Sequence, residues 1–315
     1  MKNKVLFLDS VHPVLSQRLS EANYQCVDGF NKNIDFIYEE APEVFGLVVR
    51  SRFRLDELFL SRFPALRFIA RSGSGLDNID QLYCEKNNIA LFNSPEGNRN
   101  AVAEHVLGLL LGLMNNIVQA NDEINKGFWN RESNRGEELK GKTIGIIGYG
   151  HNGKATAEKL MSFGLTILCY DKYVQVPDNK LIKPASLATI FNEADVVSLH
   201  LPLTEETHYF ADLDFFTAFR KPIYFLNIAR GKIVDTSALV AALKSGIVKA
   251  AGLDVLEYEE TSFERLFNDQ HSERLTFLKQ APNVILTPHI AGWTKESNIL
   301  LSDVLADKIL SFSFL

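Results

Sequence analysis

The sequence predicts an α/β protein with two doubly wound parallel sheets, one in each of two domains. Three observations support this prediction. Short apolar runs alternate with helical patterns, turn-forming residues bound the runs, and the chain has 315 residues, of which 46% are hydrophobic. A chain of this length and composition can build two globular domains, each with its own core.

Strands are expected where β-branched or aromatic residues form continuous runs, because such runs suit a parallel sheet that is buried on both faces. Residues 98–120 carry apolar side chains at helical spacing and separate two series of runs, so we expect a long helical connection there. Helical patterning returns after Trp293 and continues nearly to the C-terminus. In chain order the runs lie at residues 5–9, 46–51, 66–73, 143–148, 165–171, 194–202, 222–231 and 248–255.

Charge and cysteine content narrow the possible functions. With a net charge of −6 and no broad basic stripe, the chain is not expected to bind nucleic acid. Its three cysteines, Cys26, Cys84 and Cys169, are widely spaced and form no C-x-x-C pair. We therefore expect buried free thiols in a reducing compartment, and neither a disulfide framework nor a metal site.

The N-terminal stretch "MKNKVLFLDS" reaches Asp9 too soon for the apolar core of a signal peptide. The longest apolar run, residues 106–114, is much shorter than the ~20 residues of a membrane span. We expect a cytoplasmic protein that does not enter a membrane.

The stretch "KTIGIIGYGHNGKATAEKL" contains the pattern Gly148-x-Gly150-x-x-Gly153 between an expected strand and an expected helix. This placement turns backbone N–H groups and the positive end of a helix toward a pyrophosphate. Gly148 would form the tight turn, Gly150 would let the phosphates approach, and Gly153 would let the helix pack closely on the strand. Taken alone, the pattern is a weak signal.

The next expected strand strengthens it, because it ends in Asp171, 18 residues beyond Gly153. An acidic residue at about this distance binds the ribose hydroxyls of a dinucleotide. Its charge would repel a 2′-phosphate, and Lys172 is the nearest cation in sequence, so NAD is expected rather than NADP. A methyltransferase can begin with the same strand, turn and helix, so later residues must decide between the two.

Three chemically active residues follow the later runs. Arg230, Asp254 and His289 each come at or just after the end of an apolar run, where doubly wound sheets bind their ligands. An arginine can bind a substrate carboxylate through two hydrogen bonds, and a histidine can take up a hydroxyl proton near neutral pH. A nearby carboxylate, such as that of Glu259, would stabilise the charged imidazole. This set fits hydride transfer from a 2-hydroxy acid better than methyl transfer.

With these residues, the chain resembles the D-isomer-specific 2-hydroxyacid dehydrogenase family over nearly its whole length. Seven blocks in family order carry the resemblance: "RSGSGLDNID" (71–80), "NAVAEHVLGLLLGL" (100–113), "GIIGYGHNG" (145–153), "SLHLPLTEET" (198–207), "NIARGKIVD" (227–235), "GLDVLEYE" (252–259) and "TPHIAG" (287–292). The resemblance implies two Rossmann-like or flavodoxin-like domains with an active-site cleft between them. Residues 1–98 and 290–315 would form the substrate domain, and residues 99–289 the NAD-binding domain, through which the chain would form a homodimer.

The resemblance also implies roles for single residues. The catalytic residues would be Arg230, Glu259 and His289. The NAD-binding residues would be Gly148, Gly150, Asn152, Gly153, Asp171, Leu201, Pro202, Thr207, Ala229 and Asp254, the last facing the nicotinamide amide. A substrate carboxylate would lie against the backbone N–H groups of Ser74 and Gly75.

The choice of hydroxy acid depends on further arginines. "VVRSRFRL" contains Arg50, Arg52 and Arg54, and "FWNRESNR" contains Arg131 and Arg135. A phosphorylated substrate needs a second cationic site, which arginine suits. "RSR" and Trp129-x-Arg131 resemble the phosphoglycerate dehydrogenase branch, so we expect Arg50, Arg52 and Arg131 to bind 3-phosphoglycerate, at the first step of serine biosynthesis. A glyoxylate, hydroxypyruvate or D-lactate-type reductase and a non-enzymatic NAD-sensing protein are the alternatives.

The chain departs from the family pattern after Glu259. Glu260 and Thr261 follow it where the family usually has proline, and the segment that leads to His289 is longer than typical. We expect this segment to pack differently or to cover the cleft. No regulatory domain of the kind found in some phosphoglycerate dehydrogenases is expected.

Overall fold

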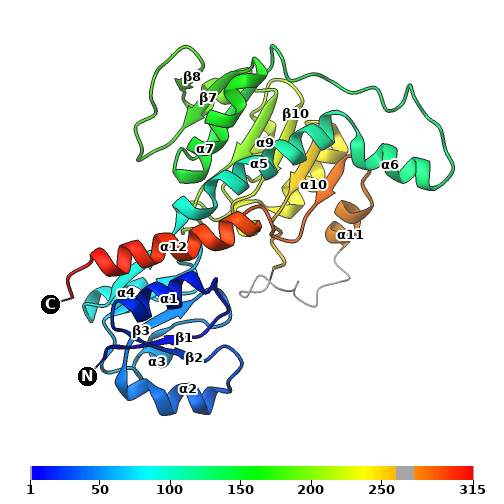
Figure 1. Cartoon of the computed structure of the whole chain (residues 1–315). Coiled ribbons are helices and arrows are strands. Elements are labelled where there is room, and N and C mark those ends of the chain that lie inside the picture. Colours follow the sequence, from blue (N-terminus) through cyan, green and yellow to red (C-terminus); the bar gives the residue numbers. More distant parts are fainter. Residues whose placement is uncertain (1, 260–272, 315) are drawn as a thin grey trace. The chain divides into compact units, whose positions relative to one another are not determined.

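The computed structural model describes residues 2–259 and 273–314, which form two compact units (Figure 1). The first unit takes in residues 2–99 and 293–314, and the second takes in residues 100–259 and 273–292. Each unit contains one parallel sheet with its helices, which confirms the predicted fold class. The assignment of residues 1–98 with 290–315 to substrate and of residues 99–289 to NAD stays a prediction.

The first unit contains a five-stranded parallel sheet in the order β2-β1-β3-β4-β5. Successive residues of β1 enter different cores, because Val5 packs with Leu15 and Leu305 on one face while Leu6 packs with Ile37 and Phe59 on the other. The strands are β1 (Lys4–Phe7), β2 (Gln25–Asp28), β3 (Val44–Val49), β4 (Phe68–Arg71) and β5 (Ala90–Asn93). The helices are α1 (Val14–Glu21), α2 (Ile34–Glu40), α3 (Glu57–Leu60), α4 (Gln81–Lys86) and α12 (Lys295–Ser311), with a 3₁₀ turn at Ala41–Glu43.

The second unit contains a seven-stranded parallel sheet in the order β12-β11-β10-β9-β6-β7-β8. Its strands are β6 (Thr143–Ile147), β7 (Thr166–Tyr170), β8 (Ile182–Pro184), β9 (Val196–Leu199), β10 (Ile223–Asn227), β11 (Val248–Leu253) and β12 (Val284–Leu286). The helices are α5 (Pro95–Met114), which begins in the first unit, α6 (Ile117–Asn125), α7 (His151–Leu160), α8 (Leu187–Glu193), α9 (Leu213–Thr217), α10 (Thr236–Ser245) and α11 (Glu273–Gln280), with 3₁₀ turns at Met161–Phe163 and Gly231–Ile233.

Both faces of the second sheet are covered. In β10, Leu226 packs in a cluster with Leu109 of α5, whereas Phe225 packs in a cluster with Phe216 of α9. The chain moves from β6 to β7 on one side and later to β9 on the other side of β6, so the strand order reverses beside β6. Doubly wound sheets bind ligands at such a reversal.

Among the described residues, no single helix has the length and apolar character to cross a membrane. Helices α5 and α6 have that length and apolar character only when they are taken together, and the chain bends by 59° between them.

Candidate active site

Three polar side chains gather where neighbouring strands of the second sheet end. Asn227 is the last residue of β10, Asp254 follows β11, and Thr287 follows β12. These strands are parallel neighbours, so their carboxyl ends meet at the same edge of the sheet. Parallel pairing therefore brings together side chains that lie far apart in the sequence.

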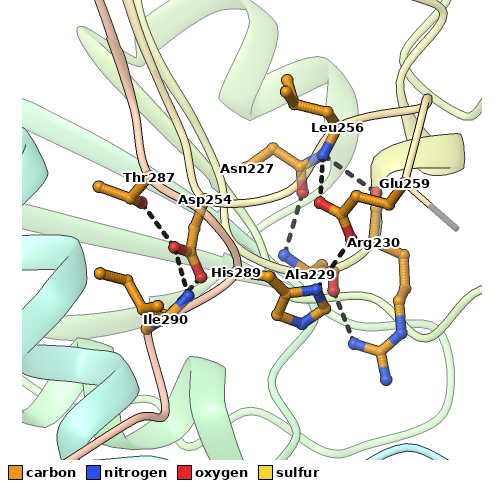
Figure 2. A network of polar contacts seen from close by, with 10 residues as sticks. Asn227, Ala229, Arg230, Asp254, Leu256, Glu259, Thr287, His289 and Ile290 are labelled. Atoms are coloured by element: carbon orange, nitrogen blue, oxygen red, sulfur yellow. Dashed lines mark hydrogen bonds and ion pairs between the residues drawn. The ribbon is translucent and has the colours of Figure 1, made fainter. Parts of the chain in front are cut away.

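The predicted acid–base pair, Glu259 and His289, is in direct contact (Figure 2). His289 Nδ1 lies 2.9 Å from Glu259 Oε2, and the two side chains are only 24% and 13% exposed. The other carboxylate oxygen of Glu259 accepts a hydrogen bond of 2.6 Å from the backbone N–H of Leu256. Because an ionised carboxylate can only accept, this contact favours the tautomer of a neutral imidazole with its proton on Nδ1, in which Nε2 is the accepting nitrogen.

Asp254 holds the loop that carries His289. Its carboxylate accepts hydrogen bonds from the Thr287 hydroxyl (2.5 Å) and from the backbone N–H groups of Ile290 (2.9 Å) and Ala291 (2.8 Å). Its backbone carbonyl accepts another from the N–H of His289 at 2.7 Å. These contacts hold His289 at a φ of 56°, a left-handed conformation that is uncommon for a residue other than glycine. Asp254 therefore orients the imidazole through the backbone.

His105 of α5 adds a contact that sequence reasoning missed. Its Nε2 lies 3.0 Å from Thr287 Oγ1 and 3.4 Å from Asp254 Oδ1. Burial by itself would raise the pKa of Asp254, but hydrogen bonds from His105 and Thr287 outweigh it and lower the pKa below its ordinary value. Asp254 is thus a buried anion with partners on α5 and on the loop after β12. A histidine within the apolar helical run 100–113 was the available signal.

Arg230 follows β10 at the same edge of the sheet (Figure 2). One guanidinium nitrogen donates to the carbonyl of Ala229 at 2.7 Å, and the Arg230 carbonyl accepts from the Asn227 side-chain amide at 3.0 Å. A Cβ atom on Gly231 would lie 1.9 Å from the carbonyl oxygen of Leu256. Only glycine allows this approach, so the Arg230 turn packs directly against the segment whose N–H binds Glu259.

The glycine motif has the geometry of a phosphate-binding turn. Gly148 has a φ of 97°, which favours glycine, and a Cβ on Gly153 would lie 1.9 Å from the Gly148 carbonyl oxygen. Among the described residues other than its own chain neighbours, none has an atom within 4 Å of a Cβ placed on Gly150, so the space beside the start of α7 is open there. The motif therefore fits the pyrophosphate of NAD, with room for it against the amino end of a helix.

Asp171 lies beside this motif, at the end of β7. Its Oδ2 accepts a hydrogen bond of 2.7 Å from the backbone N–H of Tyr149, inside the glycine motif. Its Oδ1 accepts bonds of 2.8 Å from the N–H groups of Tyr173 and Val174. The carboxylate is thereby fixed next to the turn, while its predicted role with the ribose hydroxyls stays a prediction.

Most of the other predicted NAD-binding residues follow strands of the second sheet, as Asp171 does. Leu201 and Pro202 follow β9, and the Pro202 carbonyl accepts a hydrogen bond of 2.6 Å from the Thr207 hydroxyl. Asn152, in the first turn of α7, has a buried Oδ1 without a hydrogen-bond partner among the described residues. The NAD contacts of these residues and of Ala229 stay predictions.

The predicted substrate residues of the first unit have partners within that unit. The Arg50 guanidinium lies 4.2 Å from the ring centre of Trp293 and donates to the Ser10 carbonyl. Arg52 donates to the carbonyls of Leu8 (3.3 Å), Gly29 (3.1 Å), Phe30 and Lys32 (2.9 Å). Its guanidinium thus joins the end of β1 to residues 29–32, a structural role that the sequence did not predict.

Two further predictions concern loops. The hydroxyl of Ser74, next to Gly75, donates to Asn98 Oδ1 at 2.7 Å, and the carboxylate-binding role of this loop stays a prediction. Arg131 is exposed in the segment between α6 and β6. The segment expected to pack differently after Glu259 lies in part outside the described residues, at 260–272.

A family model described as "D-isomer specific 2-hydroxyacid dehydrogenase, NAD binding domain" matches residues 107–291. The D-3-phosphoglycerate dehydrogenase of Bacillus subtilis is 31% identical over 312 residues, which are 98% of this chain and 57% of that protein. The hydroxypyruvate reductase of Thermotoga maritima is 35% identical over 276 residues, 87% of each chain. The chain therefore spans little more than half the length of the first relative and most of the second.

Among solved structures, the D-lactate dehydrogenase of Aquifex aeolicus, in complex with NAD and lactic acid, matches with a TM-score of 0.82 and 29% identity. The match covers 98% of this chain and 95% of that one. The family model and the NAD-bound neighbour confirm NAD as the predicted cofactor, whereas the predicted domain bounds stay a prediction.

Proposed function

We propose, because the chain belongs to the D-isomer specific 2-hydroxyacid dehydrogenase family, that it interconverts a D-2-hydroxy acid and the matching 2-keto acid with NAD as cofactor. The observation that carries this proposal is the contact of 2.9 Å between Glu259 and His289, at the same edge of the sheet as Arg230 and beside a buried Asp254. Arg230 would provide the anion-binding group, His289 the proton acceptor and Glu259 its counter-ion, while Asp254 supports the loop of His289.

Each side chain has a separate task. The Arg230 guanidinium would bind the substrate carboxylate and the oxygen on C2. His289 Nε2 would take the hydroxyl proton during oxidation and return it during reduction, while Glu259 stabilises the imidazolium. Asp254 keeps the His289 loop in place. The residues of the glycine motif, with Asp171, would hold NAD, which would supply the hydride acceptor for C2.

For the substrate, we propose 3-phosphoglycerate, oxidised to 3-phosphohydroxypyruvate at the first step of serine biosynthesis in the cytoplasm. The phosphoglycerate dehydrogenase relative and the arginines 50 and 131 support this choice. Hydroxypyruvate or glyoxylate reduction is the second candidate. The Thermotoga relative favours this candidate. Arg52 also favours it, because its guanidinium donates to four backbone carbonyls and is thus engaged within the protein instead of being offered to a substrate phosphate.

A panel of keto acids with NADH separates these candidates. Phosphohydroxypyruvate, hydroxypyruvate, glyoxylate and pyruvate would be compared by kcat/KM from the loss of NADH absorbance. The proposal predicts the highest value for phosphohydroxypyruvate, and a higher value for hydroxypyruvate would favour the second candidate. Binding of NADH with no turnover of any acid would favour the non-enzymatic NAD-sensing protein.

Two matched arginines sharpen this test. Arg131 and Arg135 are both exposed and both lie between α6 and β6, and Arg135 is paired with Glu132. We expect Arg131→Ala to raise KM for phosphohydroxypyruvate but not for hydroxypyruvate, whereas Arg135→Ala should change neither. Equal effects of the two substitutions would reject a phosphate-binding role for Arg131.

We also propose a homodimer formed through the second unit. Five large apolar side chains of α6 and the following segment are exposed, with Trp129 at 78%. They are Ile117, Val118, Ile124, Phe128 and Trp129. Large apolar side chains that are exposed close together in sequence are typical of an interface between proteins. The mass of one chain is 35.4 kDa, and sedimentation velocity should give twice this value. Trp129→Asp should weaken the association.

A further inference from the structure

Three side chains form a bridge between two loops at the carboxyl edge of the second sheet. The Lys172 ammonium donates a hydrogen bond to Glu206 Oε1, and the Tyr173 hydroxyl donates to Glu206 Oε2 at 2.7 Å. The same ammonium lies 5.4 Å from the centre of the Tyr173 ring. Both oxygens of the Glu206 carboxylate are therefore engaged by residues of the loop after β7.

This bridge spans the start of the glycine motif. Lys172 follows β7 and Glu206 follows β9, while β6, which leads into the motif, lies between these two strands. Asp171, the neighbour of Lys172, accepts a hydrogen bond from the Tyr149 N–H in the motif itself. The bridge is thus next to the predicted position of the adenosine ribose.

NAD and NADP differ at this ribose, since NADP carries a phosphate on the 2′-oxygen. An acidic residue at the end of the second strand favours the free hydroxyl, whereas a nearby cation accommodates the phosphate. The chain has both groups side by side, because Lys172 directly follows Asp171. The ammonium of Lys172 could attract a 2′-phosphate unless another anion held it elsewhere.

We propose that Glu206 is a specificity-determining residue, whose carboxylate holds the Lys172 ammonium away from the 2′-phosphate position and so favours NAD over NADP. This inference rests on the proposed function, because it places the cofactor ribose at Asp171. Hydrogen bonding between the two side chains raises the pKa of Lys172 and lowers the pKa of Glu206, so both remain charged at neutral pH.

The test is a double-mutant cycle on nucleotide binding. Dissociation constants of NADH and NADPH would be measured from nucleotide fluorescence at low ionic strength for wild type, Glu206→Gln, Lys172→Met and the double variant. Glu205→Gln is the matched control. Glu205 is the exposed neighbour of Glu206 and lies outside the bridge, and this substitution also removes one negative charge. All positions are exposed, and equal melting temperatures would show that the fold is intact.

We expect Glu206→Gln to tighten NADPH binding about fivefold relative to NADH, the size expected for one exposed charge pair. Lys172→Met alone should change the preference by less than about twofold, but in the Glu206→Gln background it should remove the gain. An equal gain with Glu205→Gln, or a gain that persists without Lys172, would overturn the inference while leaving the proposed function intact. Failure of the wild type to bind NADH would overturn both.

Discussion

Replacing Glu259 with glutamine keeps the size of the side chain and removes the charge that faces His289. In the wild type, Glu259 Oε1 accepts from the Leu256 N–H and Oε2 faces His289 Nδ1. A glutamine has one accepting oxygen. If it keeps the Leu256 contact, its NH₂ group faces Nδ1 and favours the tautomer with the proton on Nε2, which cannot take a proton from a substrate.

The size of the effect follows from the contact distance. Two unit charges at 2.9 Å interact by about 1.4 kcal/mol in water and by about 6 kcal/mol at an effective dielectric constant of 20. Because the side chains are 24% and 13% exposed, the pair lies between these limits. A charged hydrogen bond contributes about 1.5–3 kcal/mol, so kcat should fall roughly 10- to 150-fold.

The assay is steady-state loss of NADH absorbance with the best substrate of the keto-acid panel. Glu257→Gln is the matched control, because Glu257 lies on the same segment and contacts Tyr209 and the backbone of Thr236. We expect Glu259→Gln to lower kcat with little change in the NADH dissociation constant, and Glu257→Gln to retain most activity. A kcat within twofold of wild type for Glu259→Gln would refute the reasoning.

Gly150→Ala should weaken NADH binding at least tenfold without lowering the melting temperature, whereas Gly153→Ala should cost about 1–3 kcal/mol of stability, because its Cβ would lie 1.9 Å from a carbonyl oxygen. His105→Leu should lower kcat about tenfold, whereas His105→Gln, which keeps an N–H donor, should retain most of the wild-type kcat. Hydrogen bonding from Lys142 lowers the pKa of Glu137 from 4.5 to about 2, so this carboxylate contributes stability above pH 4.5 that is lost as pH falls through about 2. The melting temperature of Glu137→Gln should therefore lie below wild type above pH 4.5 and converge with it near pH 2.

Each of these predictions has a contradicting result. A stable Gly150→Ala variant with unchanged NADH affinity would show that the phosphates do not bind at the glycine turn. Equal kcat for the leucine and glutamine variants of His105 would show that shape, and not the donated hydrogen bond, supports Asp254. A melting-temperature difference for Glu137→Gln that persists at pH 2 would assign its effect to packing.

The sequence predicted the interior strands of both sheets and missed the four strands at sheet edges. The interior strands β6 and β10 are almost wholly buried and form continuous apolar runs. The missed strands β2, β5, β8 and β12 are edge strands with partly exposed residues, such as "QCVD" and "IKP". An edge strand is identified by its neighbour in the sheet, which lies elsewhere in the chain.

The candidate site was predictable in so far as it depends on side chains that local motifs place. Glu259 and His289 come from two such motifs, and their contact follows from the neighbouring strands β11 and β12. The partners of Arg52 are backbone carbonyls, which any residue can provide, so no sequence pattern identifies them. The contact of His105 with Thr287 joins residues 182 positions apart and arises only from packing of α5.

The most direct measurement follows the hydride itself. NADH carrying deuterium at both positions of C4 would be incubated with the preferred keto acid, and the product would be analysed by mass spectrometry and chiral chromatography. Our account predicts one deuterium on C2 of a D-hydroxy acid, made at a rate that His289→Ala reduces by at least tenfold without loss of NADH binding. Deuterium missing from C2, an L-product, or an undiminished rate in the His289 variant would contradict it.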